Sequence, residues 1–272
     1  MYVEGLATRA TPQMGRFQRF SLHLAPPSGK MNTCALMPPP VLESVVSDIF
    51  ELTPTVKTFR LRLPKGVDAG FKAGQFCSVH ILREDKILRK PYSICSAPYE
   101  KEYLDLCIKR VEGGFVSSFF CDYLKVGAIL PLQLPYGHFT MKEPYDYEFV
   151  FVATGTGLAP LRSMTRQLIH DGVDRPIWLF FGARYEDDLL YDDEWRALEK
   201  KHSNFNYIPC VSRPEKWDGE RGYVQDAARK YLTSPAEKQV YLCGLVPMVE
   251  SCKVAFTEMG FGKDQIHFEK YV

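Results

Sequence analysis

The stretch Phe149-Val150-Phe151-Val152-Ala153-Thr154-Gly155-Thr156-Gly157-Leu158-Ala159-Pro160 decides how the second half of the chain folds. An apolar run of strand length leads into a Gly-x-Gly turn, and a helix opened by Pro160 follows. Such a turn leaves free backbone N–H groups where a pyrophosphate can bind. The stretch therefore predicts a nucleotide-binding loop formed by Thr154, Gly155, Thr156 and Gly157, although packing of helix against strand would also explain both glycines.

The same rhythm continues to the end of the chain. Further apolar runs of strand length at Trp178–Gly182, Asn206–Val211 and Gln239–Cys243 alternate with amphipathic stretches of helix length. Alternating strands and helices are typical of a doubly wound parallel sheet. We expect an α/β domain over residues 144–272.

The first half has a different pattern. Short runs rich in β-branched and aromatic residues, such as Val56–Leu63 and Gln75–Ile81, are separated by Pro, Gly and Asp. They predict an antiparallel β-barrel over residues 41–143. Residues 1–40 hold a single acid, Glu4, and are expected to be a disordered extension; an organelle transit segment and a start codon placed upstream of Met31 are both open explanations.

Composition excludes several classes of function. The net charge is +1, from 34 basic and 33 acidic residues, so no global field attracts nucleic acid. No apolar run reaches the roughly 18 residues that a membrane span needs. The eight cysteines show no Cys-x-x-Cys pair and no iron–sulfur spacing. We expect a cytoplasmic protein with reduced thiols and no metal site.

Two short motifs in the first half are suited to a flavin. Lys90, Pro91, Tyr92 and Ser93 supply a cation for phosphate, an aromatic face and a hydroxyl, although an edge strand with an ordinary tyrosine is the alternative. Downstream, the glycines and hydroxyl of the run Gly113-Gly114-Phe115-Val116-Ser117 would let backbone approach a phosphate, and a hairpin turn uses glycines equally well.

A last motif lies near the C-terminus, where Cys243-Gly244 ends an apolar run and Met248 follows. A thiol there would lie at the carboxyl edge of the sheet, where open α/β sheets bind ligands. A buried small hydrophobic residue is the alternative interpretation of the cysteine.

In this order, the four motifs resemble those of the ferredoxin–NADP reductase superfamily over residues 42–272. The family's flavin motif reads Arg-x-Tyr-Ser/Thr, so the resemblance implies that Tyr92 stacks on FAD and Ser93 bonds near its N5, with Lys90 in place of the arginine and Arg89 beside it. It also implies that Gly113, Gly114 and Ser117 hold the flavin pyrophosphate and that Cys243, Gly244 and Met248 lie beside the nicotinamide. Glu269 and Tyr271 are similar to a C-terminal Glu-x-Tyr of the family, with Val272 following here.

The resemblance implies an enzyme that moves a hydride from NAD(P)H to FAD and then single electrons to a separate protein. Ferredoxin or flavodoxin is the expected acceptor; a reductase component of an oxygenase or cytochrome system is the first alternative, and a non-catalytic nucleotide-binding subunit is the second. Ser93, Cys243 and Glu269 are the expected catalytic residues.

Two arginines favour NADPH over NADH. Arg184 and Arg213 each follow a predicted parallel strand, and Ser212 adds a hydroxyl, so the three can meet a 2′-phosphate. The alternative is that these arginines form surface ion pairs with Glu186, Asp187, Asp188 or Glu215.

Overall fold

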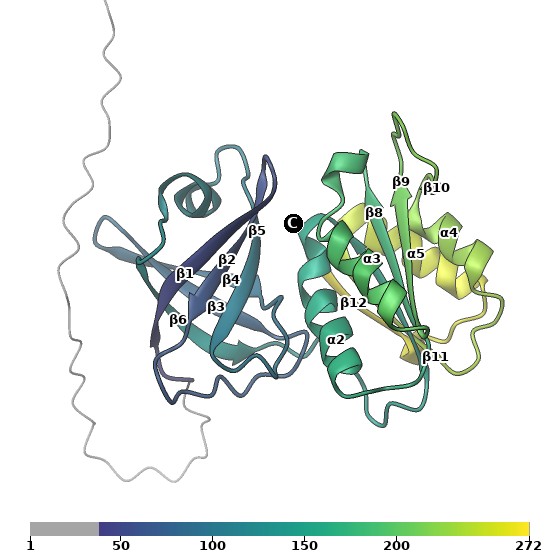
Figure 1. The fold of residues 1–272 in the computed structure, drawn as a ribbon, viewed down its shortest axis with the longest axis horizontal. Coiled ribbons are helices and arrows are strands. Elements are labelled where there is room, and N and C mark those ends of the chain that lie inside the picture. Colours follow the sequence, from purple (N-terminus) through teal and green to yellow (C-terminus); the bar gives the residue numbers. More distant parts are fainter. Residues whose placement is uncertain (1–37, 272) are drawn as a thin grey trace, which may run out of the picture. The chain divides into compact units, whose positions relative to one another are not determined.

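The computed structural model describes residues 38–271, and its first part is an antiparallel sheet of six strands. The strand order is β4-β3-β6-β1-β2-β5, and an isolated antiparallel bridge between Ile94 and Leu106 brings the two edges together as a barrel (Figure 1). Alternation explains the packing: in β6, Leu130, Leu132 and Leu134 are buried, whereas the residues between them are not. The strands are β1 (Leu42–Thr53), β2 (Val56–Arg62), β3 (Phe76–Arg83), β4 (Lys86–Ser93), β5 (Tyr103–Lys109) and β6 (Ile129–Tyr136).

The second sheet is parallel throughout, with the order β10-β9-β8-β7-β11-β12. Its two central strands, β7 and β11, hold nearly continuous buried apolar runs, as expected for strands covered on both faces. They are β7 (Glu148–Thr154), β8 (Ile177–Ala183), β9 (Phe205–Val211), β10 (Glu220–Arg221), β11 (Lys238–Leu245) and β12 (Ile266–Tyr271).

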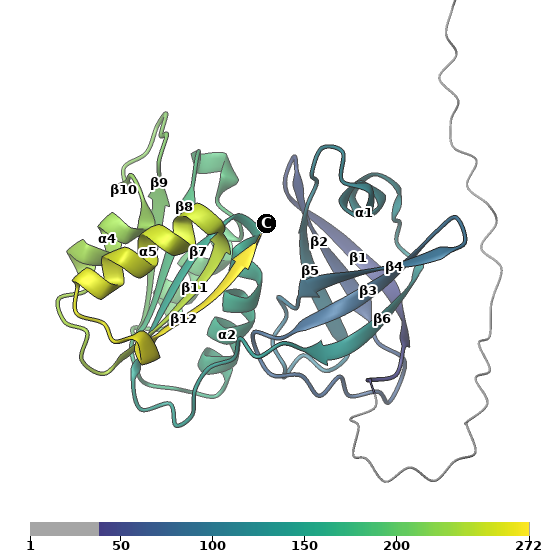
Figure 2. The same cartoon turned by 180° about the vertical axis from the view of Figure 1, so that it is seen from behind.

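Helices cover this sheet on two faces (Figures 1 and 2). Leu161 of α2 and Trp195 of α3 belong to one apolar core, whereas Ala228 of α4 and Val249 of α5 belong to another. The helices are α2 (Leu158–His170), α3 (Asp192–Lys201), α4 (Val224–Tyr231) and α5 (Val246–Glu258). In the barrel, a four-residue α1 (Phe115–Ser118) runs into a π-helical turn, η1 (Phe119–Tyr123).

The strand order reverses between β7 and β11. From β7 the chain continues through β8 and β9 toward one edge of the sheet, whereas β11 and β12 extend it toward the other. Loops that leave the carboxyl ends of β7 and β11 therefore diverge, and ligands of open α/β sheets bind at such a point. The topology places the predicted nucleotide loop and Cys243-Gly244 there.

The predicted fold class is confirmed, and differences are small. The helix after Gly157 begins at Leu158, following a 3₁₀ turn, and Pro160 lies in its first turn, where no backbone donor is needed. The domain boundary between residues 143 and 144 stays a prediction. The expectations for residues 1–37, including Cys34, and for Val272 lie outside the described residues.

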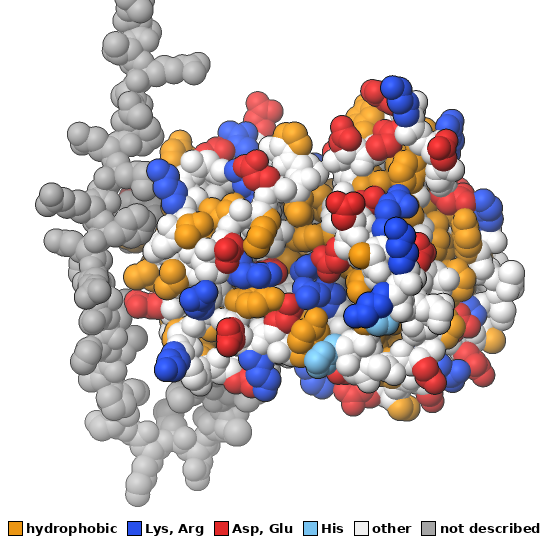
Figure 3. All heavy atoms as spheres, in the orientation of Figure 1, with side chains coloured by type: hydrophobic (Ala, Val, Ile, Leu, Met, Phe, Trp, Pro, Cys, Tyr) orange, Lys and Arg blue, Asp and Glu red, His pale blue; other side chains and the backbone are white. Residues whose placement is uncertain are grey.

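Membrane spans, surface charge and cysteines can each be compared with the expectations from the sequence. Within residues 38–271, no helix is long and apolar enough to cross a membrane. Basic and acidic side chains are interspersed over the face drawn in Figure 3. The described cysteines are all free thiols, and most are buried. Cytoplasmic location stays a prediction.

Candidate functional site

The end of β4 carries the first motif and packs it against the second. The ring of Tyr92 meets the edge of Phe120 with centroids 5.4 Å apart, and Phe120 belongs to η1 directly after the Gly113–Ser117 run. Burial raises the pKa of Tyr92 to about 12. Ser93 is buried, whereas Lys90 and Pro91 are exposed. The exposed lysine is therefore accessible to the phosphate of a ligand. Two of the four predicted motifs are thus neighbours in the barrel.

The Gly113–Ser117 turn is shaped by its own hydroxyl. Ser117 Oγ accepts a hydrogen bond from the Val111 N–H at 3.1 Å and donates one to the Gly114 carbonyl at 3.1 Å. Gly113 has a φ of +74°, a conformation that favours glycine. The prediction that Ser117 holds a pyrophosphate is untested; in the structure, its side chain fixes the loop that would present backbone N–H groups.

The nucleotide loop is packed closely against the C-terminal motif. A Cβ on Gly157 would lie 2.4 Å from the carbonyl oxygen of Cys243, and a Cβ on Gly244 would lie 2.5 Å from Thr154 Oγ1. Side chains at either glycine would force the two loops apart. The structure therefore brings together the third and fourth motifs at the switch point. Gly155, with a φ of +53°, and Thr156 complete the turn, and a Cβ on Gly155 would meet nothing within 4 Å.

Four predicted residues converge from the two sheets. The Tyr271 hydroxyl donates a hydrogen bond to Ser93 Oγ, and Glu269 is the register partner of Cys243 on the neighbouring strand. Burial raises the pKa of Cys243 well above its ordinary value, which keeps it a neutral thiol. Burial also raises the pKa of Glu269, and a hydrogen bond with Ser93 acts in the opposite direction.

Met248 supports this region from α5. Its Cε would lie 2.8 Å from a Cβ on Gly244, and its sulfur accepts a contact from the Cys252 thiol at 3.6 Å. The flexible thioether therefore packs behind the glycine. A direct contact of Met248 with nicotinamide stays a prediction.

The two candidate arginines lie side by side at the carboxyl edge of β8 and β9. The Arg213 N–H donates to the Arg184 carbonyl at 2.8 Å, and Ser212 Oγ donates to the Ala183 carbonyl at 3.2 Å. Both arginines are exposed, and neither forms an ion pair with another described residue. Glu186 instead accepts the backbone N–H groups of Glu215 and Lys216. The surface-pair alternative is therefore not what the structure shows.

Sequence reasoning missed a third arginine at this edge. Arg221 lies on β10, and its register partner on β9 is Val211, the residue before Ser212. Exposed Tyr223 follows two residues later. A strand of two residues has no periodicity that could predict it. Asp218-Gly219 before the strand and Gly222 after it were the local signals, and they indicate turns rather than a strand.

One observation tests whether the loop fits a nucleotide. Thr154 Oγ1 is buried and has no hydrogen-bond partner among the described residues. Because most buried hydroxyls are paired, an orphaned one at the switch point fits a polar ligand that completes its bonding. The loop, the two glycines and the neighbouring arginines are therefore consistent with a bound dinucleotide.

Comparisons with known families define the class of protein. An oxidoreductase FAD-binding domain matches residues 43–141, and an oxidoreductase NAD-binding domain matches residues 151–253. These ranges follow the two sheets. The chain is an oxidoreductase with one domain for FAD and one for a nicotinamide dinucleotide.

Similarity to individual proteins identifies the superfamily within this class. The chain is 35% identical over 228 residues to ferredoxin–NADP reductase B of Sorangium cellulosum, covering 81% of this chain and 93% of that protein. It is 31% identical to the phenol hydroxylase P5 protein of Acinetobacter pittii, covering 85% of this chain but 65% of that protein. The crystal structure of the Amycolatopsis cytochrome P450 reductase GcoB superposes with a TM-score of 0.79 at 26% identity, covering 85% of this chain and 69% of that one. The chain belongs to the ferredoxin–NADP reductase superfamily.

Proposed function

We propose that this enzyme accepts a hydride from NADPH where Ser93, Tyr271 and Cys243 meet, and that it delivers single electrons to a separate acceptor protein. The observation that carries the proposal is the convergence of the flavin motif of β4 with the ends of β11 and β12. Hydride transfer needs the two reacting atoms about 3 to 3.5 Å apart, so donor and acceptor sites must meet. FAD, when bound, accepts the hydride and can release its two electrons one at a time.

The barrel residues would hold the flavin. Tyr92, half-buried and supported by Phe120, offers a fixed aromatic face for the isoalloxazine. Ser93 offers a hydroxyl near the flavin N5. Exposed Lys90 with the Gly113-Gly114 turn and Ser117 would hold the phosphates, the lysine as a point charge.

The α/β residues would hold the nucleotide. Thr154, Gly155, Thr156 and Gly157 would cradle its pyrophosphate, and Cys243 with Gly244 and Met248 would border the nicotinamide. Arg184, Ser212 and Arg213 are proposed to bind the 2′-phosphate, because two unpaired guanidinium groups on one sheet edge favour a dianion. Buried and neutral, Cys243 offers a polarizable surface without a charge.

The acceptor is proposed to be a ferredoxin or a flavodoxin. One relative, of whose length this chain covers 93%, is named a ferredoxin–NADP reductase. A second candidate is an oxygenase component, because the phenol hydroxylase P5 protein and the cytochrome P450 reductase are also similar to this chain. A non-catalytic nucleotide-binding subunit would reduce none of these acceptors.

A reconstituted reaction separates these candidates. Purified protein is mixed with NADPH and with a [2Fe–2S] ferredoxin, a flavodoxin or a phenol hydroxylase oxygenase component, and acceptor reduction is followed by absorbance. We expect saturable reduction of the ferredoxin or the flavodoxin at low micromolar concentration. Reduction of ferricyanide alone, with none of the three proteins reduced, would contradict the acceptor proposal. Colourless protein that binds no added FAD would favour the non-catalytic subunit.

A further inference from the structure

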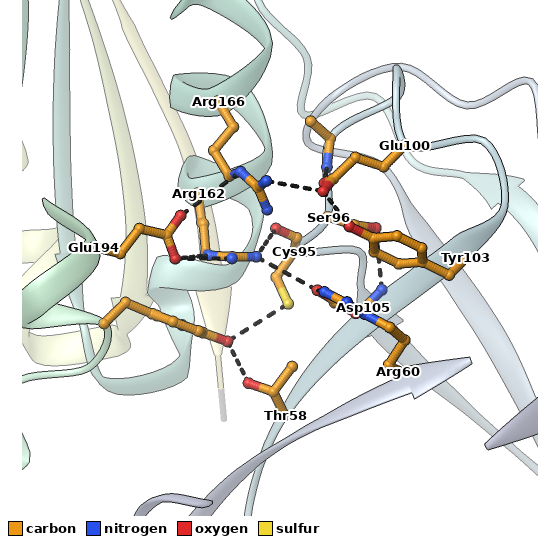
Figure 4. A network of polar contacts seen from close by, with 12 residues as sticks. Thr58, Arg60, Cys95, Ser96, Glu100, Tyr103, Asp105, Arg162, Arg166 and Glu194 are labelled. Atoms are coloured by element: carbon orange, nitrogen blue, oxygen red, sulfur yellow. Dashed lines mark hydrogen bonds and ion pairs between the residues drawn. The ribbon is translucent and has the colours of Figure 1, made fainter. Parts of the chain in front are cut away.

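One network of polar contacts between the barrel and the α/β domain centres on a buried side chain, Arg162 of α2 (Figure 4). Its residue is 6% exposed. Its Nη1 donates to the Cys95 carbonyl at 2.8 Å, and its Nε and Nη2 donate to Glu194 Oε2 at 3.0 and 2.8 Å. Asp105 Oδ2 lies 3.8 Å from Nη1. The guanidinium therefore contacts both domains at once.

The position of Arg162 along the chain gives these contacts their meaning. It lies on the second turn of the helix that begins directly after Gly157. A shift of Arg162 therefore shifts the nucleotide loop at the start of the same helix. Its barrel partner, Cys95, is two residues beyond Ser93. A single hydrogen bond thus links the helix carrying the nucleotide loop to the chain segment that ends the flavin motif.

The barrel side of this contact is itself held in place. The Cys95 N–H donates to the Asp105 carbonyl at 2.9 Å. The carboxylate of Asp105 accepts two bonds from Arg60, at 2.8 and 2.9 Å. Such bidentate pairs fix orientation as well as distance. The carbonyl that Arg162 reaches is therefore a rigid point of the barrel.

Tyr191 makes a second bond between the domains. It precedes α3 with a φ of +57°, a backbone conformation that bulky residues rarely adopt. Its hydroxyl bonds with Thr58 Oγ1 of β2 at 2.6 Å, and the Arg162 guanidinium lies over its ring, 4.5 Å from the centroid. An unfavourable backbone conformation persists where the surrounding contacts fix it. Here those contacts are made by Thr58 of the barrel and by Arg162.

The charge of Arg162 is retained inside this interface. Burial is the largest single effect and acts to lower its pKa, but the charge of Glu194, the hydrogen bond with Glu194 and the neighbouring Cys95 and Tyr191 together raise the pKa. Arg166, one turn further along α2, bonds with Glu100 of the barrel at 2.8 Å. A buried guanidinium with directional partners tolerates few orientations, because a lost partner leaves an unpaired charge.

We propose that Arg162 is a positioning residue for hydride transfer, with Tyr191 fixing the same interface. By holding the start of α2 against the Cys95 carbonyl, it sets the distance between the nicotinamide and flavin N5. This inference rests on the placement of the two cofactors given under Proposed function. Each domain would still bind its own cofactor without Arg162, but their alignment would be lost.

The test compares Arg162→Gln with Arg196→Gln, each purified with FAD. Arg196 is a matched control because its ion pair with Asp192, at 2.7 Å, lies within α3. Rapid mixing with NADPH under anaerobic conditions gives the rate of flavin reduction, and NADP⁺ titration gives the dissociation constant. We expect Arg162→Gln to slow flavin reduction by roughly tenfold to a hundredfold, while FAD content and NADP⁺ affinity stay close to wild type. Arg196→Gln should match wild type in all three.

A second readout needs no turnover. Hydrogen exchange of the FAD-loaded, nucleotide-free protein should show faster exchange in the Ser93–Cys95 segment and in α2 for Arg162→Gln only. A wild-type rate of flavin reduction in a folded Arg162→Gln protein would overturn the proposal, whatever its exchange rates. If that variant does not fold, Arg162→Lys decides: slower reduction with unchanged NADP⁺ affinity supports the proposal, and wild-type reduction overturns it.

The result also separates this inference from the proposed function. Wild-type protein that neither NADPH nor NADH reduces contradicts the proposed function. Wild-type protein that is reduced, with Arg162→Gln equal to it, contradicts the positioning role of Arg162 alone.

Discussion

The hydroxyl of Tyr271, at the end of β12, donates a hydrogen bond to Ser93 Oγ at the end of β4. Tyr271 also packs against the apolar core that contains Cys243. The phenol therefore contacts the residue predicted beside the flavin and lies next to the residue predicted beside the nicotinamide. On the proposed placement of the two cofactors, a nicotinamide ring that reaches the flavin has to displace this side chain.

Replacing Tyr271 should therefore tighten nucleotide binding. We expect Tyr271→Ser to bind NADP⁺ more tightly by about two- to tenfold, because displacing an aromatic contact costs about 0.5–1.5 kcal/mol. Tyr271→Phe keeps the ring and removes only the bond to Ser93, so its affinity should stay near wild type. Difference spectroscopy during NADP⁺ titration measures both variants. Equal affinities for wild type and Tyr271→Ser would show that the ring does not block the nicotinamide.

The orphaned hydroxyl of Thr154 gives opposite expectations for stability and binding. Thr154→Val replaces a buried, unpaired oxygen by a methyl group of similar shape. In nucleotide-free protein, this change should raise the free energy of unfolding by about 1 kcal/mol or leave it unchanged. Affinity for NADP⁺ should fall, because the ligand loses a hydrogen-bond partner. Denaturant unfolding and calorimetric titration test the pair of effects, and a variant that is less stable yet binds NADP⁺ normally would assign Thr154 a structural role only.

The proposed 2′-phosphate site at the edge of β8 and β9 predicts which nucleotide the enzyme prefers. Charge-assisted hydrogen bonds contribute about 1.5–3 kcal/mol each, so Arg184→Ala and Arg213→Ala should each lower kcat/KM for NADPH by roughly tenfold or more. The value for NADH should change little, because it carries no 2′-phosphate. Steady-state kinetics with both nucleotides measure the ratio. If wild type prefers NADH, or if both variants lose activity equally with the two nucleotides, these residues do not read the phosphate.

Burial of Glu269 predicts a pH-dependent stability. Its folded-state pKa is raised above 4.5, so its contribution to stability is complete at lower pH and is lost as pH rises through the raised value. Glu269→Gln carries no charge at any pH. In FAD-free protein, the Tm of this variant relative to wild type should therefore rise as pH increases from below the ordinary glutamate range to neutrality.

Glu51 provides the control for this pH series. A hydrogen bond with Lys57 lowers the pKa of Glu51, so its carboxylate is favoured in the folded state. The Tm of Glu51→Gln relative to wild type should fall or stay level over the same range. A flat profile for Glu269→Gln would mean that water reaches Glu269 freely in the folded protein.

The elements that sequence could predict are those with strong periodicity. The run Phe149–Ala153 indicated β7 because five consecutive apolar residues suit a strand covered on both faces, and the glycines after it indicated a sharp turn. The two-residue β10 and the short π-helical η1 have too few residues for any pattern to emerge. Arg221 and Phe120, which these elements place beside predicted residues, were missed for that reason.

The residues of the interface between the domains could not be predicted from the sequence, for a different reason. Arg162 reads as one polar position of an amphipathic helix, and nothing local distinguishes it from Arg166. Its burial depends on Cys95 and Asp105, which lie far away in the chain and come close only after the barrel has formed. Tyr191 likewise reads as an ordinary aromatic residue before a helix. Tertiary contacts, rather than local propensity, decide such residues.

The most direct test is anaerobic mixing of the purified wild-type protein with a small excess of NADPH. Flavin absorbance should bleach in a single fast phase, and the FAD released afterwards by denaturation should be equimolar with the chain. This result is expected if the flavin motif of β4 and the nucleotide loop after β7 serve one reaction. Protein that contains bound FAD, yet is reduced by neither NADPH nor NADH although dithionite reduces it, would show that the two motifs do not serve one reaction.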